Sequence, residues 1–207
     1  MDAKICGVKN FETLKYIINH AHSPKFVGFI TNYKKSKRYV NFENLKKLVN
    51  IKKRQVNFVS VLVNPDDKIL KKIENLNFDY YQLYDVSPEK TKFIKEKYNK
   101  KIISTITIEN EKDVDRYKYF EKISDIILFD SKGYEKSIGF NHKFLSNVSK
   151  SITKMLAGNI KFDDKLDKFC KITDIIDISG SLETSGEKDI SKINIFLENI
   201  SKLKNAN

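Results

Sequence analysis

The chain has 207 residues, 40% of them hydrophobic and 12% aromatic, a composition typical of a globular protein and not of a disordered one. This length predicts a single domain, residues 1–207, with a sizeable buried core. The net charge of +12 comes from lysines that are spread over all the predicted helices and mixed with Glu and Asp, whereas arginine is scarce. The composition therefore disfavours a nucleic-acid interface, although a positive mean field can attract an anionic metabolite.

Features that would place the chain in a membrane or outside the cell are missing from the sequence. No run of about 18 apolar residues predicts a transmembrane helix, and the first residues do not form a secretory signal. The two cysteines, Cys6 and Cys170, are far apart and suggest no disulfide framework, so we expect a cytoplasmic protein without a membrane partner. His20 and His22 have no third ligand nearby in the sequence, and we expect no metal site.

The first half of the chain alternates short apolar runs with amphipathic segments. Apolar residues at helical spacing predict a helix over residues 10–21, which a proline follows at Pro24. Residues 26–30 and 56–63 are apolar runs of the kind found in parallel strands that are buried on both faces. Asp66 or Asp67 can cap one later helix, and Ser87 with Pro88 can start another.

The second half continues the alternation, with helices expected around Val114–Phe120, Phe144–Val148 and Leu166–Ile172 and a last one from Ile190. Cys170 falls in one of these apolar helical stripes and is expected in the core. In total, eight strands alternate with eight helices, spaced by about 24 residues, as a compact strand-loop-helix-loop unit requires. The strands are expected to begin near residues 3, 26, 57, 80, 102, 125, 153 and 174.

Eight such units predict an α/β fold, a single-domain (β/α)8 TIM barrel that is compact and has short loops. A doubly wound open sheet is the alternative, but no Gly-x-Gly-x-x-Gly follows the first strand, so its dinucleotide-binding form is disfavoured.

In a barrel, the active site lies where the strands end, which directs attention to the residues at those positions. Cys6 follows the first strand and Asp130 the sixth, although a buried apolar role for Cys6 and a capping role for Asp130 are open on position alone. Glycines after the seventh and eighth strands, Gly158 and Gly180, fit a loop that holds a phosphate with backbone N–H groups.

Short motifs along nearly the whole chain, in matching order, resemble those of phosphoribosylanthranilate isomerase, an enzyme family of tryptophan biosynthesis. The opening residues 4–7 (Lys-Ile-Cys-Gly) resemble the family's first strand, and residues 156–159 (Leu-Ala-Gly-Asn) its seventh. Further matches are residues 28–30 with the arginine-bearing loop 36–40, residues 61–64, 82–83 and 128–132, and residues 177–183 followed by Lys188 and Asp189.

The resemblance implies an isomerase that carries out an Amadori rearrangement with no metal and no cofactor. N-(5'-phosphoribosyl)anthranilate opens its ribose ring and becomes 1-(2-carboxyphenylamino)-1-deoxyribulose 5-phosphate. By this resemblance Asp130 is the general acid that protonates the ring oxygen, Cys6 is the general base that removes the C2 proton, and Arg38 binds the anthranilate carboxylate. The partner is then a small-molecule substrate, and the chain is a monomer or a homodimer.

Further substrate contacts follow from the same resemblance. Asp177 and Gln82 are expected to contact the substrate, Asp177 by orienting the sugar hydroxyls or the amine. The phosphate is expected at two loops, on Gly158, Asn159, Gly180 and Ser181.

Several positions depart from the family pattern. Tyr84 and Asp85 stand where the family has His-Gly, Asn159 replaces the second glycine after the seventh strand, and the glycine at Gly180 is shifted by one position. The glycine-rich loop over residues 131–139 keeps two glycines. These changes leave two alternatives open: another cofactor-free barrel isomerase acting on a phosphorylated sugar, or a barrel that only binds such a compound.

Overall fold

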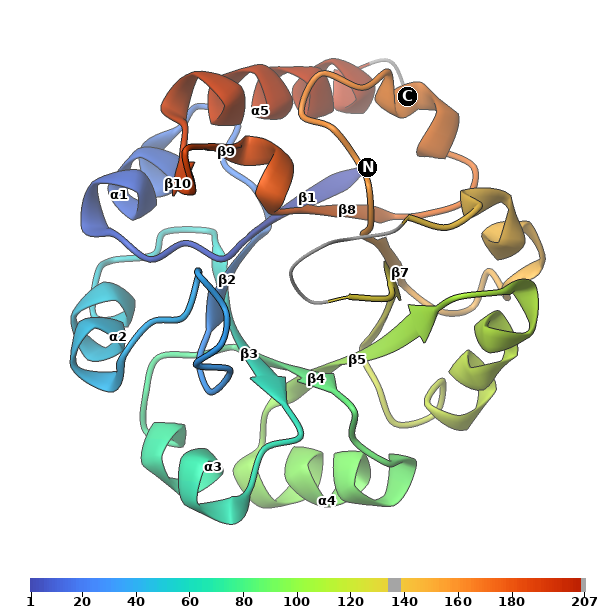
Figure 1. Ribbon diagram of the computed structural model, residues 1–207, viewed down its shortest axis with the longest axis horizontal. Helices are drawn as coiled ribbons and strands as arrows, with labels where there is room; N and C mark the ends of the chain where they lie inside the picture. Colours follow the sequence, from blue (N-terminus) through green and yellow to red (C-terminus); the bar gives the residue numbers. More distant parts are fainter. Residues whose placement is uncertain (134–138, 206–207) are drawn as a thin grey trace.

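The computed structural model describes residues 1–133 and 139–205 and shows eight parallel strands closed into a barrel, with the other elements packed around it (Figure 1). Closure is made by β8 pairing with β1, from Asp2 opposite Ile175 to Ile5 opposite Ile178. The prediction of a (β/α)8 barrel is therefore confirmed over the open-sheet alternative. The strands are β1 (Asp2–Cys6), β2 (Phe26–Ile30), β3 (Asn57–Val63), β4 (Tyr80–Tyr84), β5 (Lys101–Ile108), β6 (Ile126–Ser131), β7 (Lys154–Leu156) and β8 (Ile175–Ile178).

An α-helix follows each of the strands β1 to β4, and a fifth α-helix forms the end of the described chain. Their bounds are α1 (Phe11–Asn19), α2 (Phe42–Val49), α3 (Asp67–Ile73), α4 (Pro88–Tyr98) and α5 (Ile190–Asn205). The side chains of Asn10, Asn41, Asp66 and Ser87 each cap a helix by accepting a hydrogen bond from the backbone N–H three residues on. None of the described helices combines the length and the apolar character needed to cross a membrane.

The eight expected helices are α-helical in five of the units and 3₁₀ in the other three. After β5, β6 and β7 the described chain forms 3₁₀ helices instead: η1 (Glu111–Tyr119), η2 (His142–Asn147) and η3 (Leu166–Phe169). The apolar residues in two of these segments recur every three positions, at Val114, Tyr117 and Phe120 and at Leu166, Phe169 and Ile172. A repeat of three matches the three residues per turn of a 3₁₀ helix better than the 3.6 of an α-helix. Cys170, which follows η3, is exposed and not in the core as expected.

A short 3₁₀ turn, η4 (Gly180–Leu182), and a two-stranded hairpin, β9 (Glu183–Thr184) with β10 (Glu187–Lys188), come between β8 and α5. The hairpin lies over the end of the barrel that faces the viewer in Figure 1, where the strands have their carboxyl ends. It brings Glu183 and Lys188 back toward the barrel mouth.

Alternation along the strands sorts side chains between two buried layers. On β6, Ile126 and Leu128 belong to the barrel interior, and Ile127 and Phe129 pack against the surrounding helices. The next inward position is Asp130. The same alternation on β1 turns Cys6 inward and Ile5 outward, so the pleat of the strands points both predicted catalytic side chains into the barrel.

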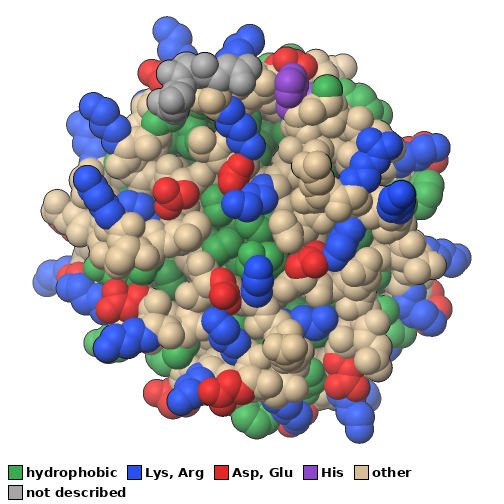
Figure 2. Space-filling view, turned by 180° about the vertical axis from the view of Figure 1, so that it is seen from behind, with side chains coloured by type: hydrophobic (Ala, Val, Ile, Leu, Met, Phe, Trp, Pro, Cys, Tyr) green, Lys and Arg blue, Asp and Glu red, His purple; other side chains and the backbone are tan. Residues whose placement is uncertain are grey.

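At the opposite end of the barrel, three aspartates at equivalent positions tie neighbouring strands together. Asp79, Asp125 and Asp174 each stand one residue before an even-numbered strand, and each carboxylate accepts a backbone N–H from the start of the preceding strand at 2.7–2.8 Å. Figure 2 views this end and shows acidic and basic side chains interspersed around a small apolar centre. The lysines at this end are dispersed among acidic residues, in agreement with their spread along the sequence.

Candidate active site

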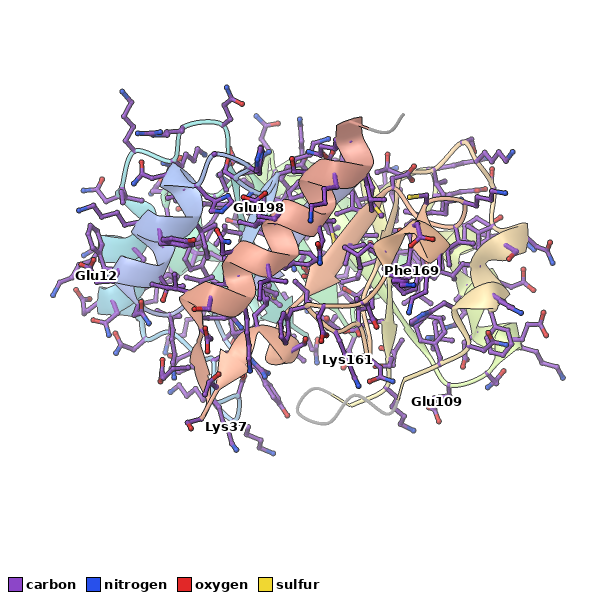
Figure 3. All side chains as sticks on the ribbon, turned by 90° about the horizontal axis from the view of Figure 1, so that it is seen from above. Glu12, Lys37, Glu109, Lys161, Phe169 and Glu198 are labelled. Carbon is purple, nitrogen blue, oxygen red and sulfur yellow. The ribbon has the colours of Figure 1, made fainter. Side chains whose placement is uncertain are left out.

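A cavity of about 310 Å³ opens at the carboxyl ends of the strands. Every residue that the sequence analysis placed in the site lines it, with the exception of Gln82; these residues are Cys6, Arg38, Asp130, Gly158, Asn159, Asp177, Gly180 and Ser181. Lys37 and Lys161 lie at the same end of the molecule (Figure 3). The loop over residues 131–139 departs from the glycine-rich pattern of the family. Its residues 134–138 lie outside the part of the chain that the structure describes.

Gln82 does not belong to the cavity wall that the described residues form. It lies on β4 at the inward position below Tyr84, it is fully buried, and neither polar atom of its side chain has a hydrogen-bond partner within the described chain. The structure thus places Gln82 beneath the cavity floor.

Cys6 is joined by a buried lysine on the same face of β1. Lys4 precedes it by two residues and points into the barrel, where its Nζ donates a hydrogen bond to Asp177 Oδ2 on β8 at 2.7 Å. Lys4 is completely buried and Asp177 nearly so. The neighbouring strand leaves room for the pair, because a Cβ built on Gly28 would lie 3.0 Å from Cys6 Sγ and 3.2 Å from Lys4 Nζ. Lys4 and Cys6 therefore both lie against Gly28.

Burial and nearby charge act in opposite directions on these groups. Burial raises the pKa of the Cys6 thiol, and the ammonium groups of Lys4 and Lys188 offset part of that rise. Burial by itself would lower the pKa of Lys4, but Asp177 and Cys6 outweigh it and leave that pKa raised, so Lys4 stays a cation. Burial also raises the pKa of Asp177, against the effect of Lys4. The thiol thus has a permanent positive charge beside it that favours the thiolate.

Asp130, at the end of β6, has both carboxyl oxygens fixed. Tyr84 Oη donates to Oδ2 at 2.8 Å, and the backbone N–H of Ser131 donates to Oδ1 at 2.8 Å. Burial raises the pKa of Asp130 to about 6; the hydrogen bond from Tyr84 opposes that rise, and the charge of Asp177 adds to it. Asp130 can therefore carry or release a proton near neutral pH, as a general acid must.

Arg38 is held at the cavity edge by a two-pronged ion pair. Its Nε and Nη2 donate to the two carboxylate oxygens of Glu183 at 2.6 and 2.9 Å, and Lys188 Nζ donates to one of them at 2.6 Å. The Arg38 hydrogen bond and Lys188 hold the pKa of Glu183 below its usual range in spite of burial, so Glu183 remains an anion between two cations. Gly7, with φ of 74°, lets the arginine pass, because a Cβ there would overlap Arg38 Cδ.

The two loops expected to hold a phosphate lie together, and Gly180 of the loop after β8 lies against Arg38, where a Cβ would be 3.1 Å from Arg38 Nη2. Ser181 Oγ accepts a hydrogen bond from the backbone N–H of Phe162 at 2.7 Å and so ties the loop after β8 to the loop after β7. Gly158, with φ of 89°, packs where a Cβ would lie 2.8 Å from Ser131 Oγ. Asn159 also has a positive φ, 54°, in the place of the family's second glycine. Lys161 lines the same part of the cavity.

Four residues with contacts in the site were not given a role by sequence reasoning: Lys4, Tyr84, Glu183 and Lys188. The signal for Lys4 was present, because a residue two before Cys6 on a strand shares its face. Glu183 and Lys188 are brought to Arg38 by a hairpin that the sequence pattern did not predict. Among the described residues, no group of three or more His, Cys, Asp or Glu side chains is arranged to hold a metal ion.

A closed eight-stranded barrel with a thiol, two carboxyls and an arginine around one cavity at its mouth defines a (β/α)8-barrel enzyme. The family model described as N-(5'-phosphoribosyl)anthranilate (PRA) isomerase matches residues 3–199. The chain belongs to the PRA isomerase family, and it is an isomerase of tryptophan biosynthesis.

Individual relatives agree with the family over the whole chain. The enzymes named N-(5'-phosphoribosyl)anthranilate isomerase from Thermoanaerobacter pseudethanolicus and Agrobacterium fabrum are each 29% identical, and the matches cover 95% of this chain and 96% and 93% of those proteins. The crystal structure of the isomerase from Thermotoga maritima has a TM-score of 0.85 at 25% identity and covers 98% of this chain and 99% of that one. A PRA isomerase in complex with reduced 1-(o-carboxyphenylamino)-1-deoxyribulose 5-phosphate has a TM-score of 0.84 at 24% identity, with the same coverage.

Proposed function

We propose that this chain converts N-(5'-phosphoribosyl)anthranilate into 1-(2-carboxyphenylamino)-1-deoxyribulose 5-phosphate, with Asp130 as general acid and Cys6 as general base. The observation that carries the proposal is that both side chains face one cavity from β1 and β6, strands that are not neighbours in the barrel. A substrate in the cavity can therefore lie between them, with the acid and the base at different atoms of the sugar.

Up to the enol, the reaction needs one proton given and one proton taken. Asp130 donates its proton to the ring oxygen as the C1–O bond breaks, and the nitrogen lone pair forms a C1=N iminium. Cys6 then removes the proton at C2, and the C–H electrons form a C1=C2 bond while the iminium becomes a neutral amine. The resulting enol becomes the ketone by taking a proton at C1 and losing the C2 hydroxyl proton.

The protonation states required are the reverse of those that dominate in the free enzyme at neutral pH. Asp130, with a pKa of about 6, is then mostly ionised, and Cys6, with its pKa raised by burial, is mostly a thiol. The reactive form is reached when one proton moves from Cys6 to Asp130, which changes no net charge. Lys4 favours this form because it stabilises the thiolate.

We assign the two ends of the substrate to different groups of residues. We assign the anthranilate carboxylate to Arg38, which Glu183 orients, and the phosphate to the loops carrying Gly158, Asn159, Gly180 and Ser181. Asp177 Oδ1 is buried, lines the cavity and has no hydrogen-bond partner in the described chain, so it is available to accept a sugar hydroxyl or the amine. Gln82 lies below the floor and is not assigned a direct contact.

The substrate carries an anthranilate fluorophore, so loss of its fluorescence on mixing with the enzyme measures turnover. We expect decay with the wild-type chain and a loss of kcat of at least about a hundredfold for Asp130→Asn, as is usual when a general acid is removed. Asp115→Asn, in η1 and outside the cavity wall, is the matched control. Absence of turnover by the wild-type chain would refute the proposed function, and a near-normal kcat for Asp130→Asn would refute the role of that residue.

A further inference from the structure

Tyr84 stands at a position where the sequence departs from the family pattern, and the structure connects it to the general acid. Resting on the function proposed above, we propose that Tyr84 is a positioning residue that fixes the Asp130 carboxyl in the cavity and stabilises the carboxylate left when Asp130 has given up its proton. The contact that supports this is the hydrogen bond of 2.8 Å from Tyr84 Oη to Asp130 Oδ2.

The fold explains why a tyrosine can make this contact. Tyr84 ends β4 and Asp130 lies on β6, so β5 separates them. The registers place Thr105 of β5 opposite Leu128 of β6 and Thr107 opposite Asp130, and both threonines lie on the same face of β5 as Ile103, which belongs to the barrel interior. Threonine is short, and the long tyrosine side chain can reach across these positions to Asp130.

The two hydrogen bonds on Asp130 hold both oxygens of its carboxyl. Ser131 N–H holds Oδ1 and Tyr84 Oη holds Oδ2, each at 2.8 Å. Because both oxygens are held, rotation of the Asp130 carboxyl about its Cβ–Cγ bond would break a hydrogen bond. The carboxyl therefore keeps one orientation toward the cavity. A phenylalanine at the same position keeps the ring in the wall but cannot hold Oδ2.

The charged groups around Asp130 show which way the tyrosine acts. Tyr84 on β4 and Lys4 on β1 favour the carboxylate, whereas Asp177 on β8 and burial disfavour it. The pKa of Tyr84 lies well above its usual value, because burial and the nearby Asp130 disfavour its anion, so the hydroxyl keeps its proton and remains a donor. Tyr84 thus makes Asp130 a stronger acid than burial alone would leave it.

Three substitutions separate this role from simple packing. Tyr84→Phe removes the donor and keeps the ring, and Tyr84→His restores a donor with the residue that the family pattern has at this position. Tyr81→Phe is the matched control: Tyr81 lies on the same strand, is fully buried, and its hydroxyl has no hydrogen-bond partner in the described part of the chain. Each variant is compared with the wild-type chain for kcat, KM and the titration of Asp130.

Infrared difference spectra that follow the carbonyl stretch of the protonated acid, assigned by its loss in Asp130→Asn, measure the titration of Asp130 without turnover. We expect Asp130 to titrate at a higher pH in Tyr84→Phe, to return to the wild-type pH or below it in Tyr84→His, and to be unchanged in Tyr81→Phe. We also expect kcat to fall severalfold in Tyr84→Phe with KM within about twofold, because a carboxyl that Oδ2 no longer anchors is misaligned with the substrate, and this loss outweighs the larger protonated fraction of Asp130.

An Asp130 titration in Tyr84→Phe equal to that of the wild-type chain overturns the proposal, whatever happens to the rate. If the wild-type chain does not turn over the substrate, the proposed function fails, but the infrared titration still decides whether Tyr84 governs Asp130. Should Tyr84→Phe not fold, Tyr84→Leu with the same titration takes its place, and a wild-type titration there is equally decisive.

Discussion

Lys4 is the residue on which the reactivity of Cys6 depends in this account. It is a fully buried cation beside the thiol and is held by a hydrogen bond of 2.7 Å to Asp177. A neighbouring charge commonly shifts a pKa by about 1–3, which corresponds to tenfold or more in the fraction of thiolate. The same charge balances Asp177, so we expect Lys4 both to favour the thiolate of the proposed base and to stabilise the barrel interior.

We therefore expect Lys4→Met to raise the pKa of Cys6 and to lower kcat/KM by at least about tenfold. The free energy of unfolding is expected to fall by about 3–5 kcal/mol, because Asp177 loses its buried partner. Alkylation rates against pH measure the thiol, in a Cys170→Ser background because Cys170 is exposed. The control is Lys25→Met, which breaks a more exposed 2.9 Å pair with Asp2 at the other end of the barrel; equal effects of the two variants would contradict the role of Lys4.

The pKa directions of Asp130 and Cys6 predict the shape of the pH profile. Between about pH 6 and the raised pKa of Cys6, reaching the reactive form only moves a proton from one group to the other, so kcat/KM is expected to be flat. Below about pH 6, Asp130 is already protonated and the thiolate fraction falls, so kcat/KM is expected to decrease about tenfold for each pH unit.

Fluorescence rates from pH 4.5 to 9 would check the profile. The phosphate of the substrate also ionises near pH 6, and Tyr84→Phe separates the two causes. An acid limb that belongs to Asp130 moves to higher pH in that variant, and one that belongs to the substrate stays in place. A rate that rises steadily from pH 6 to 8 would contradict the assigned protonation states.

At the scale of elements, a small residue on one strand leaves space inside the barrel for large side chains of the neighbouring strand. Gly28 of β2 pairs with Cys6 of β1 in the sheet and leaves the space that the Lys4 and Cys6 side chains fill. Gly28 is not among the residues with positive φ, so an alanine there meets no backbone strain, only these two side chains.

We expect Gly28→Ala to lower kcat severalfold or more, because its Cβ would lie 3.0 Å from Cys6 Sγ and displace the base, with a change in unfolding free energy of about 1–3 kcal/mol. Gly180→Ala is the contrast: a Cβ there would lie 3.1 Å from Arg38 Nη2, and the expected effect is on KM. Steady-state kinetics of both variants measure the split. The same KM effect in both, with kcat unchanged, would contradict the placement of Gly28 at the base.

The strands were predicted more accurately than the helices, because their continuous apolar runs fit only one kind of element. The strands begin at residues 2, 26, 57, 80, 101, 126, 154 and 175, close to the expected positions, because a strand buried on both faces is a continuous apolar run. The segments after β5, β6 and β7 were harder, since a few apolar residues fit an α-helix and a 3₁₀ helix almost equally. Cys170 was predicted in the core because an α-helical period was assumed for its segment, and it is exposed.

The sequence predicted the site residues that lie at strand ends. It did not predict contacts between loops that are far apart in the chain. Cys6 and Asp130 come directly from strand ends, so alternation and the barrel topology place both in the cavity. Gln82 is also on a strand, but its depth in the barrel depends on the tilt and stagger of the strands, which the sequence does not state. The pairing of Arg38 with Glu183 joins residues 145 positions apart and depends on how the loop after β2 meets the hairpin.

At the scale of the whole molecule, the positive charge of the chain is complementary to the two anionic groups of the proposed substrate. The net charge is +12, and the cavity mouth includes Arg38 and Lys161, whereas the proposed substrate carries a carboxylate and a phosphate. A positive mean field raises the local concentration of an anion and speeds its encounter with the cavity. Salt weakens this attraction, because the screening length is about 10 Å at 0.1 M ionic strength.

We therefore expect KM to rise severalfold between low salt and about 0.3 M KCl, with kcat nearly unchanged. Sucrose at matching osmolality is the control for effects other than charge. A KM that does not depend on salt would show that local contacts alone capture the substrate, and the field of the whole molecule would then have no part in binding.

The central claim is that Cys6 and Asp130 act on two atoms of one substrate held between them. A single-turnover fluorescence experiment with substrate deuterated at C2 tests it most directly, in the wild-type chain and in Cys6→Ala. We expect a slower decay with the deuterated substrate in the wild-type chain and, in Cys6→Ala, binding of the substrate without loss of the C2 deuteron. Release of that deuteron by Cys6→Ala at a rate near that of the wild-type chain would contradict it.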